Sequence, residues 1–208
     1  IMAVTMGAVA FDALNRGAKR IDALASEFIT AYDAVGNVVG TTDELGHFTQ
    51  FEYDSLHRNT KRIDGPNKEF LTAYDATGNV VSTTDELGRE TNYEYDALGR
   101  QTKRIDPFNQ EFITTYDPVG NVVSTRDELN NLTQFQYDNV NRQTKRVDPA
   151  LQEFVTDYDA AGNVVLTRNE LNHATAFEYD ALNRLVTRTD ALLGETVTTY
   201  DAVGNKLT

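Results

Sequence analysis

A Tyr-Asp pair recurs along the chain at a fixed interval of 21 residues. The pair begins at residues 32, 53, 74, 95, 116, 137, 158, 179 and 200, and Phe11-Asp12 is an earlier variant. Such a period is typical of repeat proteins, in which each copy is one supersecondary unit that stacks on its neighbours. We divide the chain into a degenerate partial repeat (1–10), nine 21-residue repeats (11–199) and a truncated tenth repeat (200–208).

Each repeat contains two turn signals. In the first, the aspartate of the pair is followed three residues later by Gly, Asn or His, as in Asp75 and Gly78 or Asp138 and Asn141. Asp at the start of a type I turn accepts backbone N–H bonds, and Gly, Asn and His accept the positive φ that a G1 bulge requires. The second signal follows the same logic, as in the segment 85–88, Asp-Glu-Leu-Gly.

The segments between the turns have the composition of short strands, as in 79–84 and 90–95. Aromatic residues two apart, such as Phe51 and Tyr53, project to one face of a strand. In alternate copies the aromatic residue lies four positions before the tyrosine, so it projects to the same face of the strand (Phe28, Phe70, Phe112, Phe154). The chain therefore has a 42-residue super-repeat made of two hairpin types. The sequence predicts an all-β fold of tandem β-hairpin repeats that form one long, coiled antiparallel meander ribbon. Because the pattern runs to both ends, we expect a fragment of a longer array.

The prolines follow the proposed turns. Pro107, Pro118 and Pro149 come directly after turn aspartates, where a φ near about −65° is favoured. Pro66 lies one position later, so the turn at 64–67 should differ from the others. None of the four prolines falls inside a proposed strand.

The net charge of −13 argues against a nucleic-acid surface. Ten aspartates belong to the Tyr-Asp or Phe-Asp pairs, and eight more begin second turns (Asp22, Asp43, Asp64, Asp85, Asp106, Asp127, Asp148, Asp190). Since these account for 18 of the 32 acidic residues, turn chemistry explains the acidity better than an acidic face for a basic partner. The apolar stretches are too short to span a bilayer, so we expect no membrane insertion.

The residues that could carry chemistry are few. His47 and His173 share one repeat position but lie six repeats apart, too far to hold one metal, and His57 occupies a turn position. The chain has no Cys for a thiolate site. Turn aspartates could bind Ca²⁺ in a ladder, yet each turn supplies a single Asp. We therefore assign no catalytic, cofactor-binding or metal-binding residue, expect no cofactor, and expect the protein not to be an enzyme.

Two further patterns have a structural and a functional interpretation. A basic pair recurs every 42 residues (Lys19-Arg20, Lys61-Arg62, Lys103-Arg104, Lys145-Arg146). It could bind a partner, but we expect it to pair with glutamates of neighbouring strands. The segment Asn131-Leu132-Thr133 matches a glycosylation signal that its sister repeats lack, and we interpret it as a chance match.

Two motifs alternate along the chain: Tyr-Asp-x-x-Gly-Arg/Asn, as in 95–100, and Asp-x-x-Gly, as in 85–88. Together they resemble the YD (Rhs) repeat family over residues 11–208. This family includes bacterial Rhs and polymorphic toxins, the shell subunits of insecticidal toxin complexes, and teneurins. The resemblance implies a spiral ribbon of β-hairpins that builds a hollow shell, often around a C-terminal toxin. The segment 117–120, Asp-Pro-Val-Gly, is similar to the family's self-cleavage motif, but it occupies ordinary turn positions.

Two functions follow as hypotheses. The first is a non-catalytic structural module in the wall of a secreted or cell-surface shell, with an encapsulated or adjacent toxin domain as its partner. The alternative is a surface module that binds carbohydrate or a cell-surface protein through aromatic faces and turn carboxylates. In addition, unpaired strands at residues 1–10 and 200–208 would favour edge-to-edge self-association.

Overall fold

The computed structural model describes residues 8–22 and 24–207, and these residues form strands and turns without a helix. They divide into two compact units, 1–109 and 110–208. The first unit contains ten strands: β1 (Ala8–Phe11), β2 (Gly17–Ile21), β3 (Glu27–Tyr32), β4 (Val38–Thr42), β5 (Phe48–Tyr53), β6 (Asn59–Asp64), β7 (Lys68–Tyr74), β8 (Val80–Thr84), β9 (Glu90–Tyr95) and β10 (Gln101–Ile105). The second contains nine: β11 (Glu111–Tyr116), β12 (Val122–Arg126), β13 (Leu132–Tyr137), β14 (Gln143–Val147), β15 (Glu153–Tyr158), β16 (Val164–Arg168), β17 (Ala174–Tyr179), β18 (Leu185–Thr189) and β19 (Glu195–Val197).

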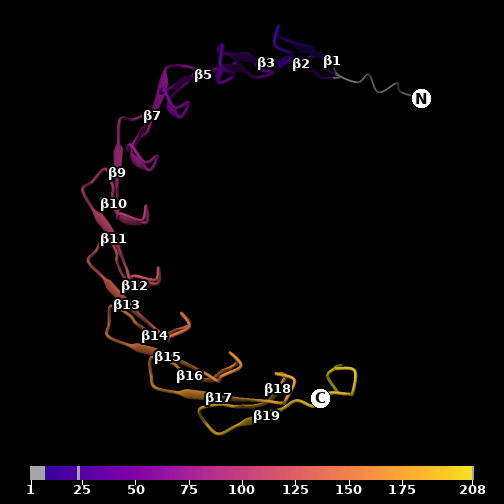
Figure 1. Cartoon of the computed structure of the whole chain (residues 1–208), viewed down its shortest axis with the longest axis vertical. Coiled ribbons are helices and arrows are strands. Elements are labelled where there is room, and N and C mark those ends of the chain that lie inside the picture. Colours follow the sequence, from indigo (N-terminus) through magenta and orange to yellow (C-terminus); the bar gives the residue numbers. More distant parts are fainter. Residues whose placement is uncertain (1–7, 23, 208) are drawn as a thin grey trace. The chain divides into compact units, whose positions relative to one another are not determined.

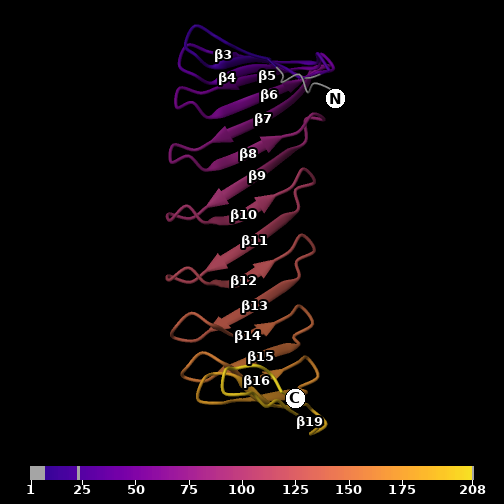
Figure 2. The ribbon, with the colours of Figure 1, turned by 90° about the vertical axis from the view of Figure 1, so that its right-hand side faces the viewer.

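Within each unit, every strand pairs antiparallel with the strand before and after it in the chain (Figures 1 and 2). The turns therefore alternate between the two edges of the meander. We call the edge that carries the Tyr-Asp turns the first-turn edge, and the other the second-turn edge. The predicted all-β hairpin meander is confirmed. Residues 1–7, most of the predicted partial repeat, lie outside the described residues.

The first turns have the predicted bulge. In the turn at Asp33, the Gly36 N–H donates to the Asp33 carbonyl, the Asp33 N–H donates to the Asn37 carbonyl, and the register shifts between Ala31 and Tyr32. The same shift precedes the tyrosine of each equivalent hairpin whose register is described, as at Tyr137 and Tyr179. The bulge residue has positive φ, for example 105° at Gly36. Glycine tolerates this φ because it lacks a Cβ.

Three positive-φ positions were missed by the sequence reasoning. Ala25, Leu151 and Leu193 close second turns with φ of 62–64°, although residues with a Cβ disfavour this conformation. Their turns still make the hydrogen bonds found at the glycine turns, as when Asp22 Oδ1 accepts the N–H groups of Leu24 and Ser26. The capping bonds therefore hold the turn conformation against the preference of the individual residue.

The turn at Pro66 differs from the others, as the sequence predicted. The Gly65–Pro66 peptide is cis, and Asn67 takes the positive φ. Strands β6 and β7 extend toward each other, so that Asp64 lies opposite Lys68 in the ladder. All four prolines lie in turns rather than in strands.

The sheet has two accessible faces. On β5 the exposed side chains alternate with the half-buried Thr49, Phe51 and Tyr53, and we call the face on which these three lie the tyrosine face. Over residues 8–22 and 24–207, no hydrophobic side chain is buried. The aromatic residues of the tyrosine face are therefore half-buried, and hydrogen bonds and neighbour-to-neighbour packing hold the ribbon together rather than a closed core.

Candidate functional site

The turn aspartates act as caps for the backbone. In the turn at Asp54, Oδ1 accepts the N–H groups of Leu56 and Arg58 at 2.9 and 3.0 Å, and Oδ2 accepts the Arg58 Nε–H at 2.7 Å. The backbone N–H of Arg58 is the main reason why the pKa of Asp54 lies below its ordinary value. Both carboxylate oxygens are thus used by donors of the same loop, which supports turn chemistry as the source of the acidity.

Arginines of the first-turn edge connect one hairpin to the next. Arg58 Nη1 donates to the carbonyl of Asp75 at 2.9 Å, and its guanidinium lies 4.6 Å from the centroid of the Tyr74 ring. Arg16 and Arg142 make the same two contacts one repeat further along the chain. One side chain therefore caps its own turn, stacks on the next tyrosine and satisfies the next turn's carbonyl.

The tyrosine hydroxyls add a second connection between hairpins. The Tyr74 hydroxyl donates to the carbonyl of Asn59 at 3.0 Å, fifteen residues earlier in the chain. The same bond recurs at Tyr32, Tyr53, Tyr95, Tyr137, Tyr158, Tyr179 and Tyr200. The Tyr-Asp pair that defines the repeat therefore performs two tasks, since Asp closes the turn and Tyr fastens it to the preceding strand.

Copies with Asn in place of Arg also connect to the next first turn, through a side-chain amide. Asn121 Nδ2 donates to Asp117 Oδ2 of its own turn at 2.8 Å and to Asn141 Oδ1 of the next first turn at 3.0 Å. Asn163 bridges to Asn183 in the same way, and the Asn37 amide lies 3.0 Å from His57 Nδ1. The 42-residue alternation thus corresponds to an alternation of Arg and Asn connectors along the first-turn edge.

The basic pairs behave as the structural interpretation predicted. Lys61 contacts Glu69 at 2.8 Å, Lys103 contacts Glu94 at 3.7 Å, and Lys145 contacts Glu153. The arginine of the pair stacks on the phenylalanine of the next strand, with Arg62 and Arg146 each 3.9 Å from the ring centroids of Phe70 and Phe154. Cross-strand pairing within the ribbon therefore accounts for this ladder.

The tyrosine face carries alternating rows of directly opposed residues. Aromatic–arginine rows, such as Phe51, Arg62 and Phe70, alternate with rows of three threonines. The threonine rows are Thr30-Thr41-Thr49, Thr72-Thr83-Thr91, Thr114-Thr125-Thr133 and Thr156-Thr167-Thr175. We call each of them a threonine triad. The sequence predicted that the aromatic residues share one face of the sheet, but the threonine triads were missed. The pattern that could have indicated them is a Thr at three fixed positions of every super-repeat.

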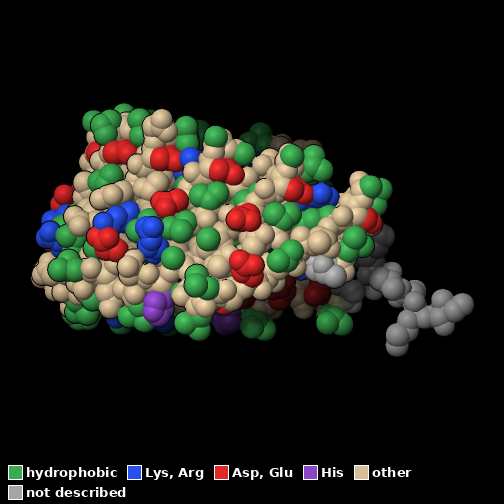
Figure 3. All heavy atoms as spheres, turned by 90° about the horizontal axis from the view of Figure 1, so that it is seen from below, with side chains coloured by type: hydrophobic (Ala, Val, Ile, Leu, Met, Phe, Trp, Pro, Cys, Tyr) green, Lys and Arg blue, Asp and Glu red, His purple; other side chains and the backbone are tan. Residues whose placement is uncertain are grey.

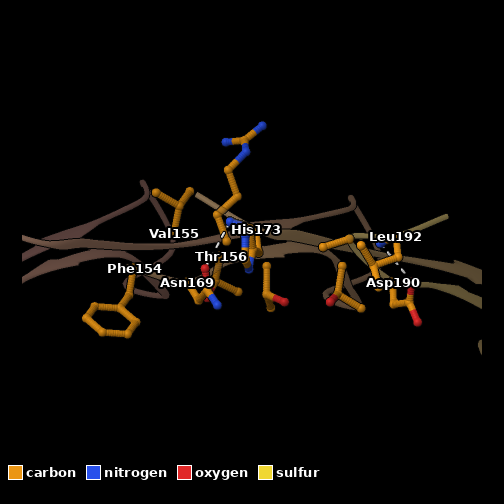
Figure 4. Close-up of a pocket in the computed structure, with 11 residues that line it drawn as sticks. Phe154, Val155, Thr156, Asn169, His173, Asp190 and Leu192 are labelled. Carbon is orange, nitrogen blue, oxygen red and sulfur yellow. Dashed lines mark hydrogen bonds between the residues drawn. The ribbon is translucent and has the colours of Figure 1, made fainter. Parts of the chain in front are cut away.

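A shallow hollow of about 540 Å³ lies at the last threonine triad, between Phe154, His173, Asp190 and Leu192. In Figure 4 the Phe154 ring and the Asp190 carboxylate point to the same side of the ribbon, whereas Val155 points to the other side. A second hollow, of about 520 Å³, is lined by the residues 84 positions earlier, including Phe70, the second triad, Arg89 and Phe108. The hollow thus recurs once in each unit, with hydroxyl groups beside an aromatic wall.

The remaining candidates have turn roles. His47 Nδ1 lies 2.8 Å from Asp43 Oδ2, and His57 occupies a turn position with a φ of 61°. His173, which the sequence analysis assigned to no site, lines the hollow. Asp117 caps an ordinary first turn through the N–H groups of Val119, Gly120 and Asn121.

The glycosylation-like segment also belongs to a turn, since Asn131 Nδ2 donates to Asp127 Oδ2 at 2.8 Å. Within the described ranges, no three His, Cys, Asp or Glu residues are grouped so that they could hold a metal. The same ranges contain no helix that is long and apolar enough to cross a membrane.

Comparison with known proteins gave one family and a set of solved structures. A sequence model described as RHS Repeat matches residues 32–67, 74–110, 116–151 and 158–192, more than half of the chain, and successive matches begin 42 residues apart. No curated protein matched.

Two solved structures are similar at low sequence identity. The crystal structure of TcdB2-TccC3-TEV has a TM-score of 0.64 at 14% identity over 97% of this chain. A structure of the Photorhabdus luminescens Tc holotoxin pore with a TccC3 mutation has a TM-score of 0.53 at 16% identity over 96%. This chain spans only 12% and 14% of those two chains, and the likeness shows a shared fold.

The connector role of the first-turn arginines can be tested with a matched pair. Arg58 and Arg89 both donate Nε–H to the aspartate of their own turn at 2.7 Å, but Arg58 also bonds and stacks on the next hairpin. We expect Arg58→Ala to lower the free energy of unfolding by about 1–2 kcal/mol. Arg89→Ala should change it by less than about 0.5 kcal/mol, as for an exposed ion pair.

Urea unfolding followed by circular dichroism measures both variants. Arg58→Lys should recover only part of the loss, because an ammonium cannot make the forked contacts of a guanidinium. Equal losses for Arg58→Ala and Arg89→Ala would show that the arginine acts only inside its own turn.

Proposed function

Because the chain belongs to the RHS repeat family, we propose that it forms part of the wall of a secreted or cell-surface shell that encloses or presents a toxin or contact domain. The observation that supports this role is the single-layer ribbon, in which the strands of each unit pair with their chain neighbours and no described hydrophobic side chain is buried. A ribbon stabilised in this way can be lengthened by adding hairpins, which is what a wall requires. The proposed role is structural and non-catalytic.

The size of the ribbon fits a segment of wall rather than a complete container. Ten strands spaced by about 4.8 Å extend roughly 45 Å along the ribbon. A folded 100-residue domain has a radius of gyration of about 13 Å, hence a diameter of roughly 33 Å, and would have to be surrounded on all sides. Enclosure therefore needs a longer array, in agreement with the 12–14% of the similar structures that this chain spans.

The wall role predicts that the two faces of the ribbon differ in access once the shell is assembled. The chain lacks Cys, so single cysteines can be introduced as unique labels. Ser124 and Thr125 are adjacent half-buried residues of β12, and their side chains lie on opposite faces. In the full-length protein that carries this array, a bulky maleimide should label one of Ser124→Cys and Thr125→Cys at least about tenfold faster than the other.

The control for this experiment is the 208-residue chain by itself, in which both cysteines should react at similar rates. Similar labelling of both positions in the full-length protein would refute the wall role, because an open ribbon has no enclosed side.

A second function, carbohydrate binding, is favoured by the hollows. Threonine hydroxyls both donate and accept hydrogen bonds, and the Phe154 ring offers an apolar surface beside them. The side chains of His173 and Asp190 add polar groups at the rim. This combination suits a sugar, which presents hydroxyl groups at its edges and C–H groups on its faces. The hollow recurs in both units, so each unit offers one such site.

Binding can be measured on an array of bacterial and animal oligosaccharides. If the hollow binds sugars, Thr167→Val and Phe154→Ala should each weaken retention of a bound glycan by about tenfold. Thr187→Val is the matched control, because Thr187 of β18 lies opposite Val197 on the other face of the sheet. Failure of the wild-type chain to retain any glycan, or unchanged retention by Thr167→Val, would eliminate this function.

A further inference from the structure

The strands separate charge between the two faces of the sheet, although the net charge of the chain is −13. Figure 3 shows acidic side chains dispersed over one side of the molecule rather than gathered in one patch. Because successive side chains of a strand point to opposite faces, the register assigns each charged strand residue to a face. On the tyrosine face, the described strands carry six cationic residues and one carboxylate (Arg20, Arg62, Lys68, Arg104, Arg146 and Arg188, with Asp64).

The strand residues of the other face are mainly acidic. They are ten carboxylates and six cations (Glu27, Glu52, Glu69, Glu90, Glu94, Glu111, Glu153, Asp157, Glu178 and Glu195, with Lys19, Lys61, Lys103, Arg126, Lys145 and Arg168). Lysines and glutamates of this face pair with each other, as Lys61 does with Glu69 at 2.8 Å. The tyrosine face is therefore cationic between its turns, in a protein that is acidic as a whole.

Two arginines of the tyrosine face in the second unit have no acidic partner. Arg146 lies opposite Phe135 and Phe154, with its guanidinium 3.9 Å from the centroid of the Phe154 ring. In the described part of the chain, neither Arg146 nor Arg188 forms an ion pair or donates a side-chain hydrogen bond. Asp190 feels the charge of Arg188, but it caps its own turn through two backbone N–H groups. Both guanidinium groups therefore keep their N–H donors available for an external acceptor.

The equivalent arginine of the first unit shows which acceptor suits this position. Arg20 Nη2 donates to Glu44 Oε1 at 2.9 Å, so a carboxylate occupies this position from the second-turn edge. Glu170 stands in the same relation to Arg146 along the sequence, but the two form no ion pair. A guanidinium can hold a carboxylate through two parallel N–H bonds. The second unit thus leaves open a carboxylate position that the first unit fills.

We propose that the tyrosine face of the second unit binds an extended acidic peptide, with one carboxylate on Arg146 and another on Arg188. This inference goes beyond the wall role, and it is separate from the carbohydrate hollows because neither arginine lines them. From Arg146 to Arg188 the ladder crosses four strands and advances four residues along them, about 19 Å and about 13 Å, hence roughly 23 Å. An extended chain rises about 3.3–3.6 Å per residue, so carboxylates roughly seven residues apart reach both arginines.

The spacing favours a peptide over a nucleic acid. A DNA strand carries one phosphate per about 3.4 Å of helix axis, so roughly seven phosphates would meet two arginines over this distance. The other phosphates would face uncharged side chains and the turn aspartates of both edges, and the net charge of −13 would repel them. A peptide can instead place apolar side chains on Phe154 and Phe177. Its backbone groups can bond the hydroxyls of the triad between the arginines (Thr156, Thr167, Thr175).

Fluorescence anisotropy with the 208-residue chain measures this binding. The probe is a labelled synthetic peptide of about fourteen residues, with two glutamates about seven residues apart among uncharged residues. Binding should be detectable below about 1 mM peptide at low salt, and it should weaken as the salt concentration rises. The same peptide with glutamines in place of the glutamates should bind at least about tenfold more weakly.

Single substitutions locate the site. Arg146→Gln and Arg188→Gln should each weaken binding at least about tenfold, because each removes the donors for one carboxylate. Arg188 is exposed, so its replacement leaves the packing of the sheet unchanged. Arg146→Lys should recover only part of the loss, because an ammonium lacks the fork of a guanidinium. Arg126→Gln is the matched control: it removes the same charge from an exposed strand residue of the other face, and it should bind like wild type.

Three results would overturn the proposal. The first is no binding of the two-glutamate peptide up to about 1 mM. The second is an equal loss for Arg126→Gln and Arg188→Gln, which would indicate attraction by overall charge. The third is tighter binding of a single-stranded oligonucleotide than of the peptide, which would indicate a polyanion site. The face-labelling and glycan experiments use other variants, so each of the three proposals can fail without the others.

Discussion

The aspartate cap at each turn is the interaction on which the rest of the structure depends. Asp54 shows the pattern, with one carboxylate oxygen holding two backbone N–H groups and the other holding the connector side chain of Arg58. This geometry fixes the positive-φ residue and the bulge, and the bulge sets where Tyr53, the residue before Asp54, lies. The position of that tyrosine then determines which carbonyl of the preceding strand its hydroxyl can reach.

Contacts between neighbouring hairpins then connect these turns along the ribbon. Arg58 and Tyr74 join one hairpin to the next, and in the alternate copies Asn121 joins its turn to the next one at Asn141. No hydrophobic side chain in the described part of the chain is buried, so stability is distributed over many similar local connections. Because no second layer covers the described strands, both faces of the sheet are accessible. The threonine triads are therefore surfaces available to a ligand.

Much of the fold could be predicted from the sequence because Asp, Gly, Asn and Pro report directly on turn conformation. The period gave the hairpins, and the distinct turn at Pro66 followed from one displaced residue. Leu151 and Leu193 were missed as positive-φ residues because capping bonds override the preference of a single side chain. The Arg58–Tyr74 stack and the threonine triads depend on cross-strand register, which a bulge shifts by one residue and which local sequence does not display.

The most direct test is an NMR titration of the turn carboxyl groups. Hydrogen bonds from loop donors lower the pKa of these aspartates below its ordinary value (Asp54, Asp96, Asp127, Asp138, Asp180). A pKa lowered by folding stabilises the native state above the unfolded value of about 3.9, and this stabilisation is lost as the pH falls through the folded pKa. The account predicts carboxyl titrations below about 3.9 at these turns, and values at or above 3.9 would contradict it.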